Sequence, residues 1–336
     1  RPEVLVAIGG CMSQEENVVN ELIKRHPYVN IVFGTHNIHE LANYLQNALE
    51  NKQEVEVFSE EGCVYEHVSY KRASNITAWV NIIYGCDKFC TYCIVPYTRG
   101  KERSRKLEEV VQEVLSLKEQ GYQEVTLLGQ NVNAYGHDLE EGYEFSDLLE
   151  AVAKTNIPRI RFVTSHPWNF TDKMIEVIAQ YENIMPYIHL PLQSGSDRIL
   201  KLMGRRYTKE EYLALYKKMK ERIPNVAITT DIIVGFPGET EEDFLDTLEV
   251  VDACQFDGAY TFIFSPREGT PAAKMVDSTP LEEKEERLHR LNEKINSYSK
   301  MHNERLVGKV VPVLLLGPSE KDKDFLYGYT DTMKLV

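Results

Sequence analysis

The sequence predicts an α/β protein whose largest part is a partial (β/α)6 barrel. Six short apolar runs from residue 77 onward alternate with amphipathic stretches of helix length. Polar residues follow these runs, and the first run leads into a cluster of three cysteines. Alternation of strands and helices predicts a parallel sheet with right-handed crossovers. Six units are too few to close an eight-unit barrel, so we expect the barrel to be open.

An α/β unit precedes the predicted barrel. Residues 3–8 form an apolar run that ends at two glycines, which indicates a buried strand. Ser13 and Glu16 then have the spacing of a capping box, which predicts a helix as far as about residue 24. Cys11 lies between this strand and this helix, a common position for ligand-binding loops in open α/β sheets. Its position alone is consistent with either a structural cysteine or a metal ligand.

A second strand and helix complete this unit. Residues 30–34 are typical of a strand, and residues 38–49 have the periodicity of an amphipathic helix. Residues 53–74 are charged and irregular, so we expect a linker there. Cys63 in that stretch has no partner pattern and is predicted to be a surface thiol.

The barrel elements follow in order. The predicted strands are residues 79–83, 124–128, 159–163, 187–190, 227–234 and 259–264. The predicted helices between them are residues 107–120, 144–154, 171–181, 196–221 and 240–253. Catalytic residues of such barrels gather at the carboxyl ends of the strands, where the cysteine cluster also lies.

A long helix and a small β domain are expected after the barrel. Residues 282–306 have apolar positions at helical spacing and are predicted to pack across the barrel. Alternation from Val310 to Leu314, and then residues 325–329, indicate the first strands of an incomplete β domain. Cys254, at a predicted helix end, is expected to lie in the core. The predicted domains are residues 1–74, 75–303 and 304–336.

The composition limits the class of protein. The net charge of −14 over 336 residues argues against a generally basic nucleic-acid-binding protein, and no DNA partner is expected. No run approaches the roughly 18 apolar residues of a membrane span, so no membrane association is expected. Cysteines clustered at ligand spacing favour a reducing, cytoplasmic location over a disulfide framework. The chain opens within a predicted strand and stops soon after another, so we expect both ends to be cut.

Two local cationic runs contrast with the negative net charge. Each is either a solvated face or an anion-binding surface. They consist of Arg99, Lys101, Arg103, Arg105 and Lys106, and of Arg198, Lys201, Arg205 and Arg206.

Three cysteines form the most informative motif. Cys86, Cys90 and Cys93 have the spacing Cys-x3-Cys-x2-Cys. Soft thiolate ligands select zinc, copper(I) or an iron–sulfur cluster. A closed zinc site needs a fourth ligand, commonly from a second Cys or His pair, and no such pair follows. A four-iron cluster on three thiolates would leave one iron open to a reactant. The alternatives are a zinc knuckle or inert buried thiols.

At these residues the chain resembles the radical S-adenosylmethionine superfamily. In that superfamily the spacing binds a [4Fe–4S] cluster whose open iron chelates S-adenosylmethionine, and reductive cleavage yields a 5′-deoxyadenosyl radical. Tyr92, before the last cysteine, also fits the superfamily pattern. The partial (β/α)6 barrel is the fold that this resemblance implies.

Residues at the other strand ends are candidates for binding S-adenosylmethionine. Gly129 would permit close approach of the backbone, and Gln193 and Asp231 could bond ribose hydroxyls. Arg205 is a candidate partner for the methionine carboxylate. The full candidate set for the cofactor is Tyr92, Gly129, Gln130, Ser165, Gln193, Arg205 and Asp231.

Longer motifs resemble the methylthiotransferase branch of this superfamily. They are residues 79–105, 129–133 (GQNVN), 193–197 (QSGSD) and 235–240 (GFPGET). Residues 10–14 (GCMSQ) resemble the last of three cysteine motifs that hold an auxiliary [4Fe–4S] cluster, so the resemblance makes Cys11 a ligand. The other two auxiliary cysteines are absent from this sequence. Residues 329–332 (YTDT) resemble the start of a TRAM domain, an RNA-binding β-barrel.

The resemblance implies an enzyme of tRNA modification. The sequence around Pro96 is most similar to members that methylthiolate C2 of N6-isopentenyladenosine at position 37, next to the anticodon. The implied partners are the tRNA anticodon loop and a flavodoxin- or ferredoxin-like electron donor, and the full-length protein would carry two clusters. Relatives that act on threonylcarbamoyladenosine or on a ribosomal-protein aspartate remain alternatives. A non-catalytic, metal-bearing RNA-binding protein is the alternative of a different class.

Overall fold

A computed structural model describes residues 4–50, 54–57, 64 and 71–336. The chain divides into two compact units. The first comprises residues 1–68, 84–89 and 93–103, and the second comprises residues 69–83, 90–92 and 104–336. Cys63 and most of the predicted linker lie outside the described residues. The three predicted domain boundaries stay predictions.

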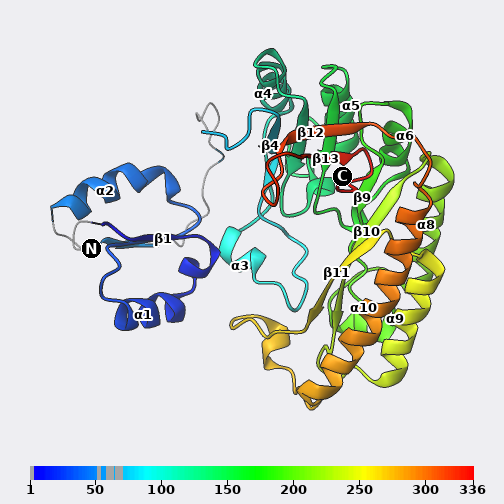
Figure 1. Cartoon of the computed structure of the whole chain (residues 1–336). Helices are drawn as coiled ribbons and strands as arrows, with labels where there is room; N and C mark the ends of the chain where they lie inside the picture. The colour runs from blue at the N-terminus through cyan, green and yellow to red at the C-terminus, as the bar shows by residue number, and fades with distance from the viewer. Residues whose placement is uncertain (1–3, 51–53, 58–63, 65–70) are drawn as a thin grey trace. The chain divides into compact units, whose positions relative to one another are not determined.

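The first unit contains a three-stranded parallel sheet in the order β1-β2-β3 (Figure 1). Ile31 and Phe33 of β2 pack with Tyr44 of α2, whereas Val32 packs with Val19 of α1. Successive strand residues point to opposite faces, so the two helices cover opposite sides of the sheet. The elements of this unit are β1 (Ala7–Gly9), α1 (Glu16–Arg25), β2 (Ile31–Phe33), α2 (Leu41–Leu49), β3 (Glu54–Glu56) and α3 (Val95–Arg99).

Two sequence predictions for this unit are wrong. The third strand, Glu54–Glu56, lies in the stretch predicted as a linker and pairs in parallel with β2. The capping box is absent, because Ser13 belongs to a short 3-10 helix and Glu15 caps α1 without a side-chain hydrogen bond. The neighbouring Gln14 instead uses Oε1 to accept hydrogen bonds from Thr35.

The second unit is an open parallel barrel, as predicted. Three strands pair in the order β4-β7-β8 and three in the order β9-β10-β11, and an isolated bridge joins Ile160 to Ile184 between the two sheets. The strands are β4 (Thr77–Asn81), β7 (Glu124–Leu128), β8 (Arg159–Phe162), β9 (Tyr187–His189), β10 (Ala227–Val234) and β11 (Gly258–Ile263). Two short strands, β5 (Ile83–Tyr84) and β6 (Arg103–Ser104), pair at the ends of the cysteine segment.

Helices cover one face of these strands. Ile228, Ile232 and Val234 of β10 belong to the main hydrophobic core, together with residues of the covering helices. In Figure 1, α8, α9 and α10 lie together along β10 and β11. The helices are α4 (Leu107–Glu119), α5 (Phe145–Ala153), α6 (Asp172–Gln180), α7 (Asp197–Leu202), α8 (Lys209–Arg222), α9 (Glu241–Cys254) and α10 (Leu281–Glu304).

The single helix predicted for residues 196–221 is two helices. Gly204 has a φ of 73°, which ends α7, and Thr208 caps α8 in a capping box with Glu211. The left-handed backbone at Gly204 is a common helix terminator. The turn between the helices carries Arg205, a predicted cofactor residue. Cys254 lies in the core at the end of α9, as expected.

The C-terminal segment closes the amino ends of two barrel strands. An antiparallel hairpin of β12 (Val313–Pro318) and β13 (Leu326–Thr330) follows α10. Arg161 of β8 donates hydrogen bonds of 2.8 Å to the carbonyl oxygens of Thr330 and Asp331. The Nζ atom of Lys334 lies 3.4 Å from Asp257, next to the start of β11. Among the described helices, none is long and apolar enough to cross a membrane.

Candidate functional site

Cys90 is held by the barrel unit through its neighbour Thr91. The Thr91 amide donates to the Met203 carbonyl at 2.9 Å, and its carbonyl accepts from the Ala272 amide at 2.8 Å. The Thr91 hydroxyl also donates to the Leu202 carbonyl. These bonds fix Cys90, which is buried, beside the turn that ends α7.

Tyr92 packs into a small apolar cluster at the same place. Its ring lies edge-on to Phe236, with 6.5 Å between centroids. Phe236 belongs to the motif of residues 235–240, so this packing links the cysteine loop to a second predicted motif. Tyr92 as a cofactor contact stays a prediction.

Cys86 and Cys93 belong to the first unit. The Cys86 amide donates to the Gly100 carbonyl at 3.1 Å. Gly85 has a φ of 77°, and a Cβ atom there would lie 1.9 Å from the Lys101 carbonyl oxygen. Only glycine permits this approach, so Gly85 is required to hold the start of the cysteine loop against residues 100–101.

The donor set of the loop fits an iron–sulfur cluster. Cys86, Cys90 and Cys93 lie within eight residues of the chain. Thiolates are the ligands that such clusters use. Within the part of the chain that the structure describes, no three Cys, His, Asp or Glu side chains are already grouped as a metal site. The assignment of these three ligands therefore rests on their chemistry and spacing and stays a prediction.

Cys11 lies in the first unit beside Arg99 of α3. It begins the 3-10 helix Cys11–Gln14, and its Sγ atom accepts a hydrogen bond of 3.2 Å from Nε of Arg99. The Thr35 hydroxyl donates to the Thr98 carbonyl at 2.5 Å. The contact between Arg99 and Cys11 was not predicted, because the two residues are 88 positions apart in the chain.

Arg205 is the predicted cofactor residue with the most informative surroundings. Its Nη1 atom lies 3.8 Å from Sγ of Cys90 and also contacts Nε2 of His166. Its guanidinium lies over the ring of Tyr207, 5.7 Å from the centroid. Burial raises the pKa of Tyr207 to about 12, so this phenol stays neutral. A cation beside a thiol and a neutral aromatic ring is suited to binding a carboxylate.

Arg205 also lines a pocket of about 310 Å³. The pocket wall contains further cations from the second cationic run and two carboxylates. Its residues are Asp197, Lys201, Arg205, Arg206, Tyr207, Thr208 and Glu211. The contact between His166 and Arg205 was not predicted, because the two residues are 39 positions apart in the chain.

Two predicted residues at the strand ends have structural roles. A Cβ atom at Gly129 would lie 2.3 Å from Cγ2 of Ile83, so packing inside the barrel already requires glycine. Gln193 has a φ of 70°, its amide donates to the Asp231 carbonyl, and its own carbonyl accepts from Ile233. Both residues therefore shape the ends of strands.

The remaining predicted residues differ in their surroundings. Ser165 is buried, and its hydroxyl has no hydrogen-bond partner among the described residues. An unsatisfied buried hydroxyl is costly, which favours a ligand partner. Gln130 is half-buried. Oδ1 of Asp231 lies 3.2 Å from Nε2 of His189.

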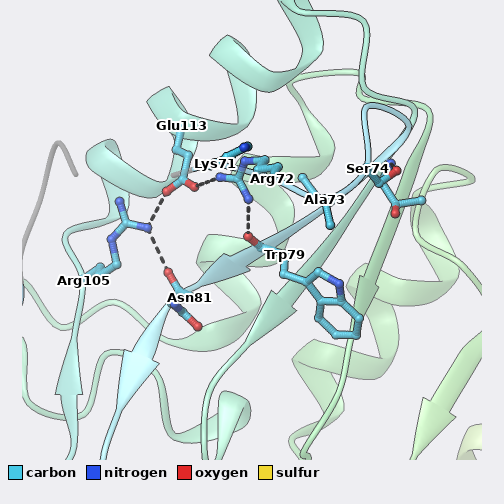
Figure 2. Close-up of a pocket in the computed structure, with 10 residues that line it drawn as sticks. Lys71, Arg72, Ala73, Ser74, Trp79, Asn81, Arg105 and Glu113 are labelled. Atoms are coloured by element: carbon cyan, nitrogen blue, oxygen red, sulfur yellow. Dashed lines mark hydrogen bonds and ion pairs between the residues drawn. The ribbon is translucent and has the colours of Figure 1, made fainter. Parts of the chain in front are cut away.

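A separate pocket of about 340 Å³ lies at the edge of β4 (Figure 2). Arg72 and Arg105 each donate to one carboxylate oxygen of Glu113, at 2.6 Å. Each arginine also donates to a carbonyl of β4, Arg72 to Trp79 at 2.7 Å and Arg105 to Asn81 at 2.9 Å. These bonds occupy the exposed edge of the sheet, so we interpret the bridge as protection of that edge. Arg105 is therefore engaged with protein groups in this arrangement.

Comparisons with known protein families and sequences agree with the open parallel barrel and its cysteine loop. The family description "Radical SAM superfamily" matches residues 80–251. The chain is 58% identical over its whole length to a tRNA-2-methylthio-N(6)-dimethylallyladenosine synthase of Staphylococcus epidermidis and 56% identical to one of Staphylococcus aureus. It spans 66% of the length of each relative. The predicted resemblance is confirmed.

Solved structures support the fold. The radical S-adenosylmethionine methyltransferase TsrM from Kitasatospora setae, with cobalamin and a [4Fe-4S] cluster bound, superposes with a TM-score of 0.61 at 17% identity, over 80% of this chain and 58% of that one. The cobalamin-dependent radical enzyme OxsB gives 0.52 at 13% identity, over 98% and 51% of the two chains. Together with the matched family and the open parallel barrel, these findings show that the chain belongs to the radical SAM superfamily.

Proposed function

We propose that the full-length protein is a methylthiotransferase that modifies C2 of N6-isopentenyladenosine next to the tRNA anticodon. The observation that carries the proposal is the identity of 58% along the whole chain to a relative of that name. The chain also keeps the three-cysteine loop and Cys11. The anticodon loop is single-stranded, so its adenine can enter a pocket without melting a duplex.

The proposed cofactors are S-adenosylmethionine and a [4Fe–4S] cluster held by Cys86, Cys90 and Cys93. When bound, they would supply reductive cleavage of the sulfonium and hydrogen abstraction by a 5′-deoxyadenosyl radical. Cys11 would hold an auxiliary cluster together with two cysteines of the full-length protein that are absent from this sequence. Reduction would come from a flavodoxin- or ferredoxin-like donor, the C-terminal hairpin would begin a TRAM domain, and the protein would work in the cytoplasm.

The residues of this chain would provide binding and orientation. Arg205 would neutralise the methionine carboxylate beside Cys90, and the buried Ser165 hydroxyl would find a partner on the cofactor. Tyr92, Gly129, Gln130, Gln193 and Asp231 are the other proposed contacts. Placement and exclusion of water are the protein's contribution, since the cofactors carry the bond breaking.

Mass spectrometry of tRNA nucleosides tests the substrate. In a strain lacking the gene, 2-methylthio-N6-isopentenyladenosine should disappear and unmethylthiolated N6-isopentenyladenosine should accumulate, and the wild-type gene should restore the product. Intact product in the deletion strain would exclude this substrate. Loss of methylthiolation on threonylcarbamoyladenosine, or on a ribosomal-protein aspartate, would identify one of the alternative relatives.

The cluster assignment has a separate test. Cys90→Ala in the full-length protein should abolish 5′-deoxyadenosine formation under reducing, anaerobic conditions. Cys254→Ala is the matched control, because Cys254 is a buried free thiol at the end of α9. Persistent 5′-deoxyadenosine in the Cys90 variant would contradict the assigned cluster, whereas stoichiometric zinc without iron in the wild type would favour a non-catalytic metal protein.

A further inference from the structure

The face of the β9-β10-β11 sheet that the helices leave uncovered carries two exposed aromatic rings. Ile228, Thr230, Ile232 and Val234 of β10 are buried, so Thr229, Asp231 and Ile233 point to the other face. The parallel register pairs Asp231 with Tyr260 and Ile233 with Phe262. Paired residues of neighbouring strands share a face. Tyr260 and Phe262 are therefore on the uncovered face, where they are 60% and 52% exposed.

A polar pair lies beside these rings on the same face. His189 of β9 pairs in register with Thr229, and its Nδ1 atom lies 3.1 Å from the Thr229 hydroxyl. Its Nε2 atom lies 3.2 Å from Oδ1 of Asp231. The His189 ring also lies edge-on to Tyr260, with 5.8 Å between centroids. The imidazole thus contacts Thr229, Asp231 and the exposed ring of Tyr260.

The face changes from polar to apolar toward the carboxyl ends of its strands. The Asp231–Tyr260 row has hydrogen-bonding groups, and the Ile233–Phe262 row, two residues further on, is apolar. Ile233 also packs against the cluster that contains Phe236 and contacts Tyr92. Ile233 and Tyr92 therefore pack against the same apolar cluster.

We propose that Tyr260 and Phe262, with the His189–Asp231 pair, form the platform that binds the substrate adenine and its apolar N6 substituent. Contiguous exposed apolar patches mark binding sites, and unpaired bases stack on aromatic rings. The polar row would face the edge of the base, and the apolar row would face the substituent. Asp231 retains a second carboxylate oxygen, so this role is compatible with its proposed contact to a ribose.

This inference rests on the proposed function, since it assumes an N6-substituted adenine in RNA. The competing occupant of the same surface is the adenosyl part of S-adenosylmethionine. The two occupants can be separated because cleavage of S-adenosylmethionine can be measured in the absence of RNA.

The test uses the full-length, anaerobically reconstituted protein and synthetic anticodon stem-loops with either N6-isopentenyladenosine or unmodified adenosine. Tyr260→Ala and Phe262→Ala should each weaken binding of the isopentenyladenosine stem-loop about 10-fold or more, the scale of base–aromatic stacking. The preference over unmodified adenosine should shrink most in Phe262→Ala. Formation of 5′-deoxyadenosine without RNA should be unchanged.

Two control variants accompany these substitutions. Tyr260→Phe keeps the ring and should recover most of the binding lost in Tyr260→Ala. Leu245→Ala removes a side chain that is 50% exposed on α9, away from the uncovered face, and should change nothing. Wild-type binding by Tyr260→Ala and Phe262→Ala, or loss of 5′-deoxyadenosine formation without RNA, would overturn the platform.

A second measurement needs no variant. A stem-loop with 2-aminopurine in place of the target adenine should lose fluorescence on binding the wild-type protein, because stacking quenches this base. An unquenched complex would contradict the proposal. If the wild type fails to methylthiolate the natural nucleoside, the proposed function fails. If the wild type methylthiolates this nucleoside while Tyr260→Ala and Phe262→Ala bind RNA normally, only the platform fails.

Discussion

The Nη1 atom of Arg205 lies 3.8 Å from the Sγ atom of Cys90, although the two residues are 115 positions apart in the chain. The contact arises because Thr91 is bonded to Leu202 and Met203, at the end of the helix before Arg205. A cation is thus placed beside a proposed cluster ligand by backbone bonds, and this relationship leads to the first prediction.

Arg205→Lys should weaken binding of S-adenosylmethionine by about 10-fold or more, because lysine lacks the planar fork that binds a carboxylate through two parallel bonds. Iron content should not change, since Arg205 is not a cluster ligand. Equilibrium dialysis of reconstituted full-length protein measures the affinity. Arg206→Lys is the matched control, because Arg206 stacks over Trp168 at 4.3 Å instead of contacting Cys90. Unchanged affinity in Arg205→Lys would remove the proposed carboxylate contact.

The strands of the barrel were predictable where apolar runs are long and bounded by turn residues. The predicted bounds of β7 and β10 match the structure. The break at Gly204 was missed because periodicity continues across the turn, and β3 was missed because two of its three residues are glutamates. Charged residues are common in edge strands such as β3. In the sequence alone, however, such a charged segment looks like a loop.

The candidate site was predictable only in part, for a physical reason. Cysteine spacing is local, so Cys86, Cys90 and Cys93 could be recognised directly. The contact of Arg99 with Cys11 and that of His166 with Arg205 depend on tertiary folding, which one sequence does not display. Gly129 was predicted for cofactor approach, whereas its contact with Ile83 shows a packing requirement.

A second prediction concerns a buried ion pair that holds the loop of residues 235–240. Arg287 of α10 is 1% exposed, and its Nη1 atom lies 2.9 Å from Oε1 of Glu239. The same Glu239 atom accepts from the Gly235 amide at 2.9 Å. Burial raises the pKa of Glu239, although Arg287 opposes this effect.

Arg287→Met should lower the free energy of unfolding by about 3–5 kcal/mol, because it leaves Glu239 buried without its partner. Urea unfolding measures this change. Arg287→Met combined with Glu239→Gln should recover part of the loss. Arg290→Met is the control, since the Arg290 side chain is 35% exposed and its pairs with Glu241 and Glu286 are nearer the surface. Equal losses of unfolding free energy in Arg287→Met and Arg290→Met would refute the special role of the buried pair.

A third prediction concerns pH. Asp243 accepts hydrogen bonds from Arg198 and from the Ser196 hydroxyl, the latter at 2.6 Å, and it caps α9 with Thr240. Burial would raise the pKa of this carboxyl, but the hydrogen bonds outweigh burial and lower it well below the usual 3.8. Because the folded state lowers the pKa, Asp243 stabilises the fold above pH 3.8, and this contribution is lost as the pH falls further.

Asp243→Asn should therefore destabilise the protein most at neutral pH. The difference in unfolding free energy from the wild type should shrink as the pH is lowered through about 3.8. Urea unfolding of both proteins over this range is the measurement. Asp252→Asn provides a comparison, because Asp252 bonds Lys294 and Tyr298 at a more exposed position. A wild-type-to-variant difference that stays constant with pH would contradict the assigned ionisation.

The last prediction concerns the attachment of the C-terminal hairpin. Arg161 is 4% exposed, and its Nε atom donates to Glu124 of β7 at 2.8 Å while its two Nη atoms donate to the carbonyl oxygens of Thr330 and Asp331. One guanidinium thus joins two barrel strands to the end of β13.

Arg161→Leu removes all of these donors, so amide hydrogen exchange should accelerate in residues 326–336. Exchange in the distant helix α9 should be unchanged. Arg159 makes a single bond of 3.1 Å to the Tyr329 carbonyl, so Arg159→Leu should have a smaller effect on the same residues. Unaltered exchange in Arg161→Leu would mean that the strand pairing of β12 with β13 holds the hairpin in place without this arginine.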